Sequence, residues 1–200
     1  MSKKTFNVKL YMSELIYDVQ NKTYITGRSR YDGDNHEAVA NMQANEDDEN
    51  ANQILRSIGD AYSTLLGKIA EFVNVSGATP SEEVTKTDVL GSASKNIEVS
   101  LDMPSNYNMA TSDAVTAAMH KYIVNMAIHE WFLMTNKADA ADYIARANSN
   151  IEQLREAINK RVRPIRSEVV ASDPPQDDPV EDPDYNLNNR PGDDTRPPIS

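Results

Sequence analysis

The sequence predicts a mainly α-helical fold: a helical bundle with an inserted β-hairpin, followed by a disordered or extended, acidic and Pro-rich C-terminal arm. Long segments with apolar residues every three or four positions predict the helices, and one alternating segment predicts a strand. Residues 167–200 contain seven of the ten prolines and nine acidic residues, and they have too few apolar side chains to form a core. The chain therefore divides into a bundle domain, 1–166, and an arm, 167–200.

The N-terminal segment is predicted to be extended first and then helical. Phe6, Val8 and Leu10 alternate with polar residues, whereas Leu15 and Val19 are spaced as in a helix. We expect a helix over 13–25, then a polar connection over 31–50 with about one helical turn at 37–42.

The longest helical pattern covers 47–75. An acidic run at 46–49 favours the positive end of the helix dipole at its start. Gly59 and Gly67 lie inside this pattern, where each costs about 1 kcal/mol relative to Ala, and they predict the close approach of another backbone.

A β-hairpin is expected between the long helices. Residues 97–103 alternate between apolar and polar, as in a half-exposed strand, and 84–90 is the expected partner. The hairpin therefore occupies about 84–103. Two more helices are predicted, over 112–135 and 139–162, and their short connection makes them an antiparallel pair.

Composition excludes several classes of protein. The chain carries a net charge of −11 and no cysteine, so it has no disulfide, thiolate nucleophile or Cys-bound zinc. No segment has the ~18 consecutive apolar residues of a membrane helix, and the first residues lack the apolar region of a secretory signal, so we expect an intracellular origin. The acidic balance argues against a dedicated nucleic-acid reader.

No catalytic, cofactor or metal site is predicted. His120 and His129 are nine residues apart on one predicted helix and point to opposite sides, so they cannot bind one ion together. The pair His129-Glu130 begins like a zinc-protease HExxH motif, but Leu133 stands at the last position. Trp131 beside Phe132 fits a core position better than a ligand pocket.

Candidate contact residues cluster near the end of the last helix and in the arm. The basic side chains there either complement the helix dipole or contact an acidic surface of a neighbouring subunit or a nucleic-acid backbone. The arm is either a solubilising extension or a strand that docks on a neighbouring subunit. The predicted contact residues are Arg155, Lys160, Arg161, Arg163, Arg166, Tyr185 and Leu187. Because one chain carries both charges, such a head-to-tail contact between identical subunits would be self-complementary, and contacts of this type close into rings.

The order of elements resembles the head-to-tail connector (adaptor, or neck ring) proteins of tailed bacteriophages, especially virion proteins of phages of gut Bacteroidales. Four stretches carry the resemblance: YMSELIYDVQNKTYITGRSR, DENANQILRSIGDAYSTLL, NIEVSLDMPSNYN and the segment 120–166. The resemblance implies a homo-oligomeric ring, commonly of twelve copies, at the head–tail junction of the virion. Portal and neck or tail proteins would be its neighbours, and DNA would pass through its lumen without sequence-specific binding.

Three functions are weighed against one another. The first is a non-enzymatic structural virion protein that forms the connector ring during genome packaging and ejection. The second is an intracellular, phage-encoded interaction or scaffolding module whose acidic arm is a docking peptide. The third, a metal-dependent hydrolase built on His129 and carboxylates of helix surfaces, has the least support, because no ligand motif is complete.

Overall fold

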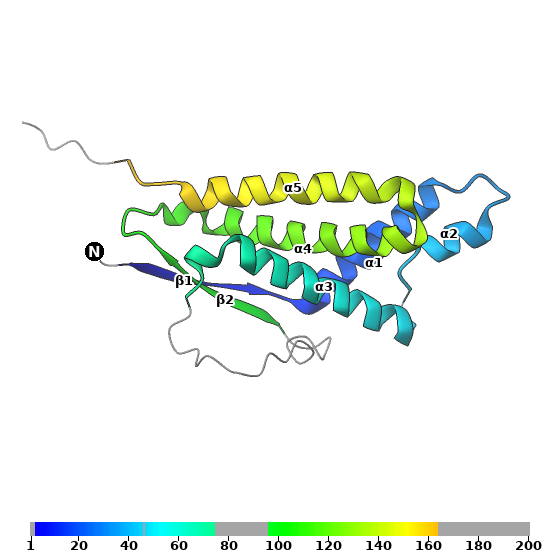
Figure 1. Cartoon of the computed structure of the whole chain (residues 1–200), viewed down its shortest axis with the longest axis horizontal. Helices are drawn as coiled ribbons and strands as arrows, with labels where there is room; N and C mark the ends of the chain where they lie inside the picture. Colours follow the sequence, from blue (N-terminus) through cyan, green and yellow to red (C-terminus); the bar gives the residue numbers. More distant parts are fainter. Residues whose placement is uncertain (1–2, 46, 75–95, 164–200) are drawn as a thin grey trace, which may run out of the picture. The chain divides into compact units, whose positions relative to one another are not determined.

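The computed structural model describes residues 3–45, 47–74 and 96–163, and it confirms a mainly helical fold with a two-stranded antiparallel β element (Figure 1). The arm and the predicted domain boundary at 166 lie outside these residues. The elements are β1 (Lys4–Leu10), α1 (Met12–Ser29), α2 (His36–Met42), α3 (Asp48–Lys68), β2 (Ile97–Met103), α4 (Ser112–Thr135) and α5 (Lys137–Asn159), with short 3-10 turns at Ala70–Phe72 and Met109–Thr111.

Helix α4 is the centre of the bundle. It runs antiparallel to α5, as predicted, and it also contacts α3, α1 and the sheet (Figure 1). Its buried side chains therefore point in every direction instead of forming one stripe, as expected for a helix enclosed by neighbours. They are Val115, Ala118, Met119, Tyr122, Ile123, Val124, Asn125, Ala127, Ile128, Trp131 and Phe132.

The two strands pair antiparallel although they lie far apart in the sequence. Leu10 faces Ile97 and Val8 faces Val99, so their apolar side chains share the face that is buried. The predicted strand over 97–103 is confirmed, and its partner in the described part of the chain is the extended N-terminal segment. The expected partner, 84–90, lies outside the described residues.

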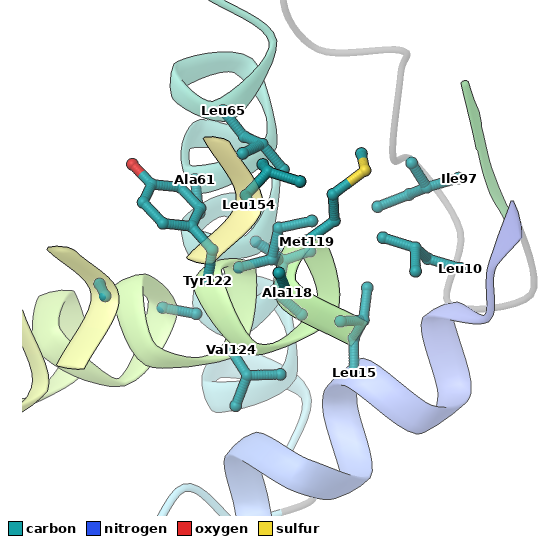
Figure 2. Packing of buried hydrophobic residues seen from close by; sticks show 14 of the residues in the cluster. Leu10, Leu15, Ala61, Leu65, Ile97, Ala118, Met119, Tyr122, Val124 and Leu154 are labelled. Carbon is teal, nitrogen blue, oxygen red and sulfur yellow. The ribbon is translucent and has the colours of Figure 1, made fainter. Parts of the chain in front are cut away.

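The core joins the sheet to the helices. Figure 2 shows Leu10 and Ile97 from the strands pointing toward Met119 of α4, with Leu15 of α1 beside them. Leu15 and Met119 are completely buried. Burying a side chain of this size contributes about 1.5–3 kcal/mol relative to leaving it exposed, so this contact fixes α1 and the sheet against α4.

Helix α3 ends at Lys68, earlier than the periodicity up to residue 75 predicts. The reason is tertiary pairing: Val73 forms a β-bridge with Leu101, and the Asn74 amide donates a 2.8 Å hydrogen bond to the Ser100 carbonyl. The predicted close approach at Gly67 is wrong, because a Cβ there would meet nothing within 4 Å.

The ends of α5 also differ from the prediction. The helix begins at Lys137 because Asn136 alone forms the connection from α4. It ends at Asn159 instead of continuing to 162, because the following backbone bonds to the loop before α4. The Lys160 carbonyl accepts from the Asn108 amide at 3.1 Å, and the Val162 amide donates to the Asn106 carbonyl at 2.8 Å.

Candidate functional site

The basic cluster predicted at the end of α5 is largely satisfied within its own helix. Arg155 forms a 2.8 Å ion pair with Glu152, and Lys160 forms a 2.7 Å ion pair with Glu156. The Lys160 ammonium lowers the pKa of the Glu156 carboxyl. Both pairs are exposed, so each adds little stability. Their charges are nevertheless compensated locally, which weakens their attraction for a partner.

Arg161 has a structural role at the same place. Its guanidinium donates a 2.7 Å hydrogen bond to the Ile158 carbonyl, one of the carbonyls that the end of a helix leaves without a helical partner. This contact is the dipole-complementing role weighed for the cluster. Arg163 is exposed. Arg166, Tyr185 and Leu187 lie outside the described residues, so their contacts remain predictions.

A shallow, open depression lies on the surface of α5 at the same basic cluster. Every residue that lines it belongs to the last three turns of α5 or directly follows them, so it has no opposing wall and encloses no small molecule. The lining residues are Glu152, Arg155, Glu156, Asn159 and Lys160.

Two of the three histidines contact a neighbouring helix. His120 Nε2 lies 3.1 Å from the Asp18 carboxylate of α1, and His129 Nδ1 lies 2.8 Å from the Ala140 carbonyl of α5. They contact different helices, which agrees with their predicted opposite directions. Trp131 donates its indole hydrogen to the Met42 carbonyl at 2.9 Å. Among the residues that the structure describes, no group of three or more metal-ligating side chains occurs.

A buried carboxylate joins α1 to α5. Asp139 accepts a hydrogen bond from Arg30 Nε at 3.1 Å, a second from the Arg30 terminal nitrogen, and a third from the Asn136 amide at 2.6 Å. The Arg30 bonds, supported by Asn136, lower the pKa of the Asp139 carboxyl. Both oxygens of the Asp139 carboxylate therefore accept hydrogen bonds that connect parts of the bundle.

The most unusual surface lies on α1. Tyr17 and Tyr24 are seven residues apart and therefore lie on one side of the helix, with exposed fractions of 62% and 44%, and Ile25 beside them is 56% exposed. We call Tyr17, Tyr24 and Ile25 the α1 tyrosine face; two further exposed tyrosines flank the helix, Tyr11 directly before it and Tyr31 two residues after its end. These five side chains are the majority of the nine large apolar side chains exposed in the described part of the chain.

A group of cations from three helices includes Lys22, which lies about 140–160° around α1 from Tyr17 and Tyr24. Lys22 of α1 is one helical turn from Ile25, and Lys121 of α4 and Arg146 of α5 are close enough to repel its charge. Burial lowers the pKa of Lys22, and Arg146 and Lys121 lower it further, while Asp18 at 4.0 Å opposes the shift. We call Lys22, Lys121 and Arg146 the three-helix basic cluster.

The basic cluster retains uncompensated charge. Arg146 lies 5.1 Å from the centre of the Tyr143 ring, a cation–π contact that leaves its charge available. Within the described ranges, neither Lys121 nor Arg146 forms an ion pair with a carboxylate. On α1 itself, Arg28 donates to the Tyr24 hydroxyl at 3.2 Å and places a cation next to the tyrosines.

Sequence reasoning missed the α1 tyrosine face. The signal is present in the sequence: Tyr17 and Tyr24 repeat at seven residues on the side opposite Leu15 and Val19. An aromatic repeat on the polar side of an amphipathic helix indicates a surface for contact. The basic cluster has no such signal, because its members come from positions 22, 121 and 146.

Comparison of the chain with protein-family models, with curated proteins and with solved structures gives no match. None of the described helices is both long and apolar enough to cross a membrane.

Proposed function

We propose that the chain is a non-enzymatic structural virion protein, a subunit of the connector ring between portal and tail. The observation that supports it most strongly is the α1 tyrosine face. Tyrosine and arginine are enriched at protein interfaces, and an exposed apolar patch on a domain with its own complete core marks a contact surface. Tyr17, Tyr24 and Arg28 form such a surface on one helix.

The charge distribution supports an assembly of identical copies around DNA. One chain combines a basic cluster on the bundle with an arm of net charge −7 at residues 167–200. A contact between unlike surfaces of identical subunits closes into a ring when its rotation closes. A net charge of −11 also suits a channel along which DNA slides during packaging and ejection, because phosphates are repelled and not held.

Two measurements test this proposal. Mass spectrometry of purified phage particles should find the chain together with the portal and neck or tail proteins. The number of copies per particle should be constant and should match the subunits of one ring. Native mass spectrometry of the expressed chain should show self-association that weakens as salt rises. Recovery of the chain from infected cells but never from particles would refute the proposal.

Paired variants identify the surface. Replacing Tyr17 and Tyr24 together by Ser should abolish self-association and incorporation into particles. Replacing Leu133 and Met134 by Ser is the matched control, because this pair is exposed to 48% and 60% at the far end of α4. Equal effects of both pairs would show that exposed apolar area in general, and not the α1 tyrosine face, causes association.

One observation favours a second function, an intracellular interaction or scaffolding module that uses its acidic arm as a docking peptide. Residues Met1–Arg163 cluster as one compact unit, so the described core is completed without a neighbouring copy. A chain that stays monomeric at all concentrations and is missing from particles would favour this module over the connector.

A further inference from the structure

We propose that the exposed side of α1 in one free chain packs against the same side of α1 in a second copy. The two helices run antiparallel and are related by a two-fold axis near Asn21. This inference goes beyond the proposed function, because it concerns the chain before assembly and applies equally to a connector subunit and to an interaction module.

One side of α1 carries a self-complementary order of side chains. Five exposed residues follow one another at intervals of three and four positions, the spacing of a helix side that packs on another helix. An acid stands at one end, a base at the other, and the amide of Asn21 between two tyrosines. The five residues are Glu14, Tyr17, Asn21, Tyr24 and Arg28.

An antiparallel second copy matches this order at each position. With the axis at Asn21, Glu14 of one copy lies level with Arg28 of the other, because both are seven residues from position 21. Tyr17 then lies level with Tyr24 of the other copy to within one residue, about 1.5 Å along the helix. A parallel pair would instead bring each charge beside its own kind, so charge favours the antiparallel arrangement.

The two end charges have no ion-pair partner within their own chain. Across the ranges that the structure describes, neither Glu14 nor Arg28 forms an ion pair. Arg28 donates a 3.2 Å hydrogen bond to the neutral Tyr24 hydroxyl, which directs its guanidinium toward the face and leaves its charge uncompensated. By contrast, Asp18 of the same helix lies 3.1 Å from His120. A second copy therefore supplies the missing partner at each end of the contact.

The tyrosines supply the apolar centre of the contact. Tyr17 and Tyr24 from two copies bring four rings around the axis, and tyrosine is among the residues enriched at protein interfaces. The fold itself does not need these rings, since α1 packs on the bundle through the opposite side, where Leu15 and Val19 are fully buried. A two-fold contact uses the same patch on both copies and closes at two, so a larger assembly on this face requires the dimer to open.

Exchange of the two end charges in the full chain tests the pairing. Glu14→Arg or Arg28→Glu alone places like charges at both ends of the contact, and each should weaken dimerisation about tenfold in sedimentation equilibrium. The double variant should dimerise as the wild type does. Its positions 14 and 28 are about 20 Å apart within one helix, so opposite charges meet again only between copies. Lys68→Glu, exposed at the end of α3, is the control and should change nothing.

Two results would overturn the inference: a wild type that stays monomeric, or a double variant that dimerises no better than the single ones. Far-ultraviolet circular dichroism confirms that each variant is folded.

A crosslink at the axis supplies the second readout. The chain has no cysteine, so Asn21→Cys introduces a single thiol that faces its counterpart in the second copy. A short bismaleimide should join these chains into covalent dimers in dilute solution. Lys68→Cys is the control and should give only the yield of chance collisions. Equal yields from both positions would place the axis elsewhere and refute the contact.

The dimer and the connector fail separately. A chain that is found in particle necks but is monomeric when free keeps the connector and refutes the dimer. A chain that is missing from particles but regains dimerisation in the double variant keeps the dimer and refutes the connector.

Discussion

A single buried hydroxyl connects α1 to the segment after α2. Thr23 is fully buried, and its Oγ1 accepts a 3.2 Å hydrogen bond from the Ala44 amide while it donates to the Val19 carbonyl at 2.9 Å. Thr23→Val keeps the shape of the side chain but removes the acceptor. The buried Ala44 amide then has no partner, whereas the Val19 carbonyl keeps its helical hydrogen bond.

The expected loss follows from these contacts. A buried donor without a partner costs about 1–3 kcal/mol, and the additional buried methyl group recovers about 0.8 kcal/mol. The helix propensities of Thr and Val are nearly equal and change nothing. The difference between the hydrogen-bond cost and the methyl gain is an expected loss of about 0.2–2.2 kcal/mol in the free energy of unfolding for Thr23→Val. Thr64→Val is the matched control, because Thr64 also donates to the carbonyl four residues earlier, at 2.9 Å, but is exposed.

Urea unfolding followed by tryptophan fluorescence measures the loss. Trp131 is the only tryptophan in the chain and contacts the end of α2, so its emission reports on this region. The midpoint for Thr23→Val should fall while the slope with urea stays constant. The control should change by less than ~0.5 kcal/mol. If Thr23→Val changes stability no more than Thr64→Val does, the Ala44 hydrogen bond has no net value.

Three further perturbations test the described contacts. Asp139→Asn should cost about 1–3 kcal/mol near pH 7, since it removes charge-assisted hydrogen bonds. Folding lowers the pKa of Asp139. Its carboxylate therefore contributes fully to the free energy of unfolding above the unfolded-state pKa of about 3.9, and this contribution disappears as the pH falls through the folded-state pKa. At that acidic pH the stabilities of the wild type and of Asp139→Asn should converge in acid unfolding curves. Trp131→Phe loses its indole hydrogen bond, and thermal melts by circular dichroism should show about 1–3 kcal/mol of destabilisation. Met119 is fully buried, so Met119→Ala leaves a cavity and should lower the free energy of unfolding in urea by about 2–5 kcal/mol. Met134 is exposed, so Met134→Ala should leave the free energy of unfolding nearly unchanged.

Local patterns were sufficient to predict most helices. Helix α4 begins at Ser112 and ends at Thr135, which are the predicted bounds. The helices at 13–25 and 37–42 are confirmed with small shifts. The end of α3 could not be predicted, because Phe72 and Val73 continue the helical spacing, whereas Phe72 lies in a 3-10 turn and the Val73 backbone pairs with Leu101 of β2.

Pairing and surface clusters depend on contacts that one sequence does not reveal. Alternation identifies β1 and β2 as strands but not as partners, since any two alternating segments match equally well. The ion pair of Arg30 with Asp139 and the grouping of Lys22 with Arg146 likewise join residues more than a hundred positions apart. The predicted basic cluster at the end of α5 illustrates the converse error: a sequence counts cations, whereas the structure shows which of them are already paired.

The distance in sequence between β1 and β2 also determines the order of events during synthesis. About 90 residues separate Leu10 from Ile97, and at ~5–20 residues per second the ribosome needs roughly 5–20 s to make them. For that interval β1 has no strand to pair with, and its apolar side chains have no α4 to cover them. Lys9, on the opposite face of the strand, and Lys4, at its start, provide the charge that discourages pairing with strands of other nascent chains.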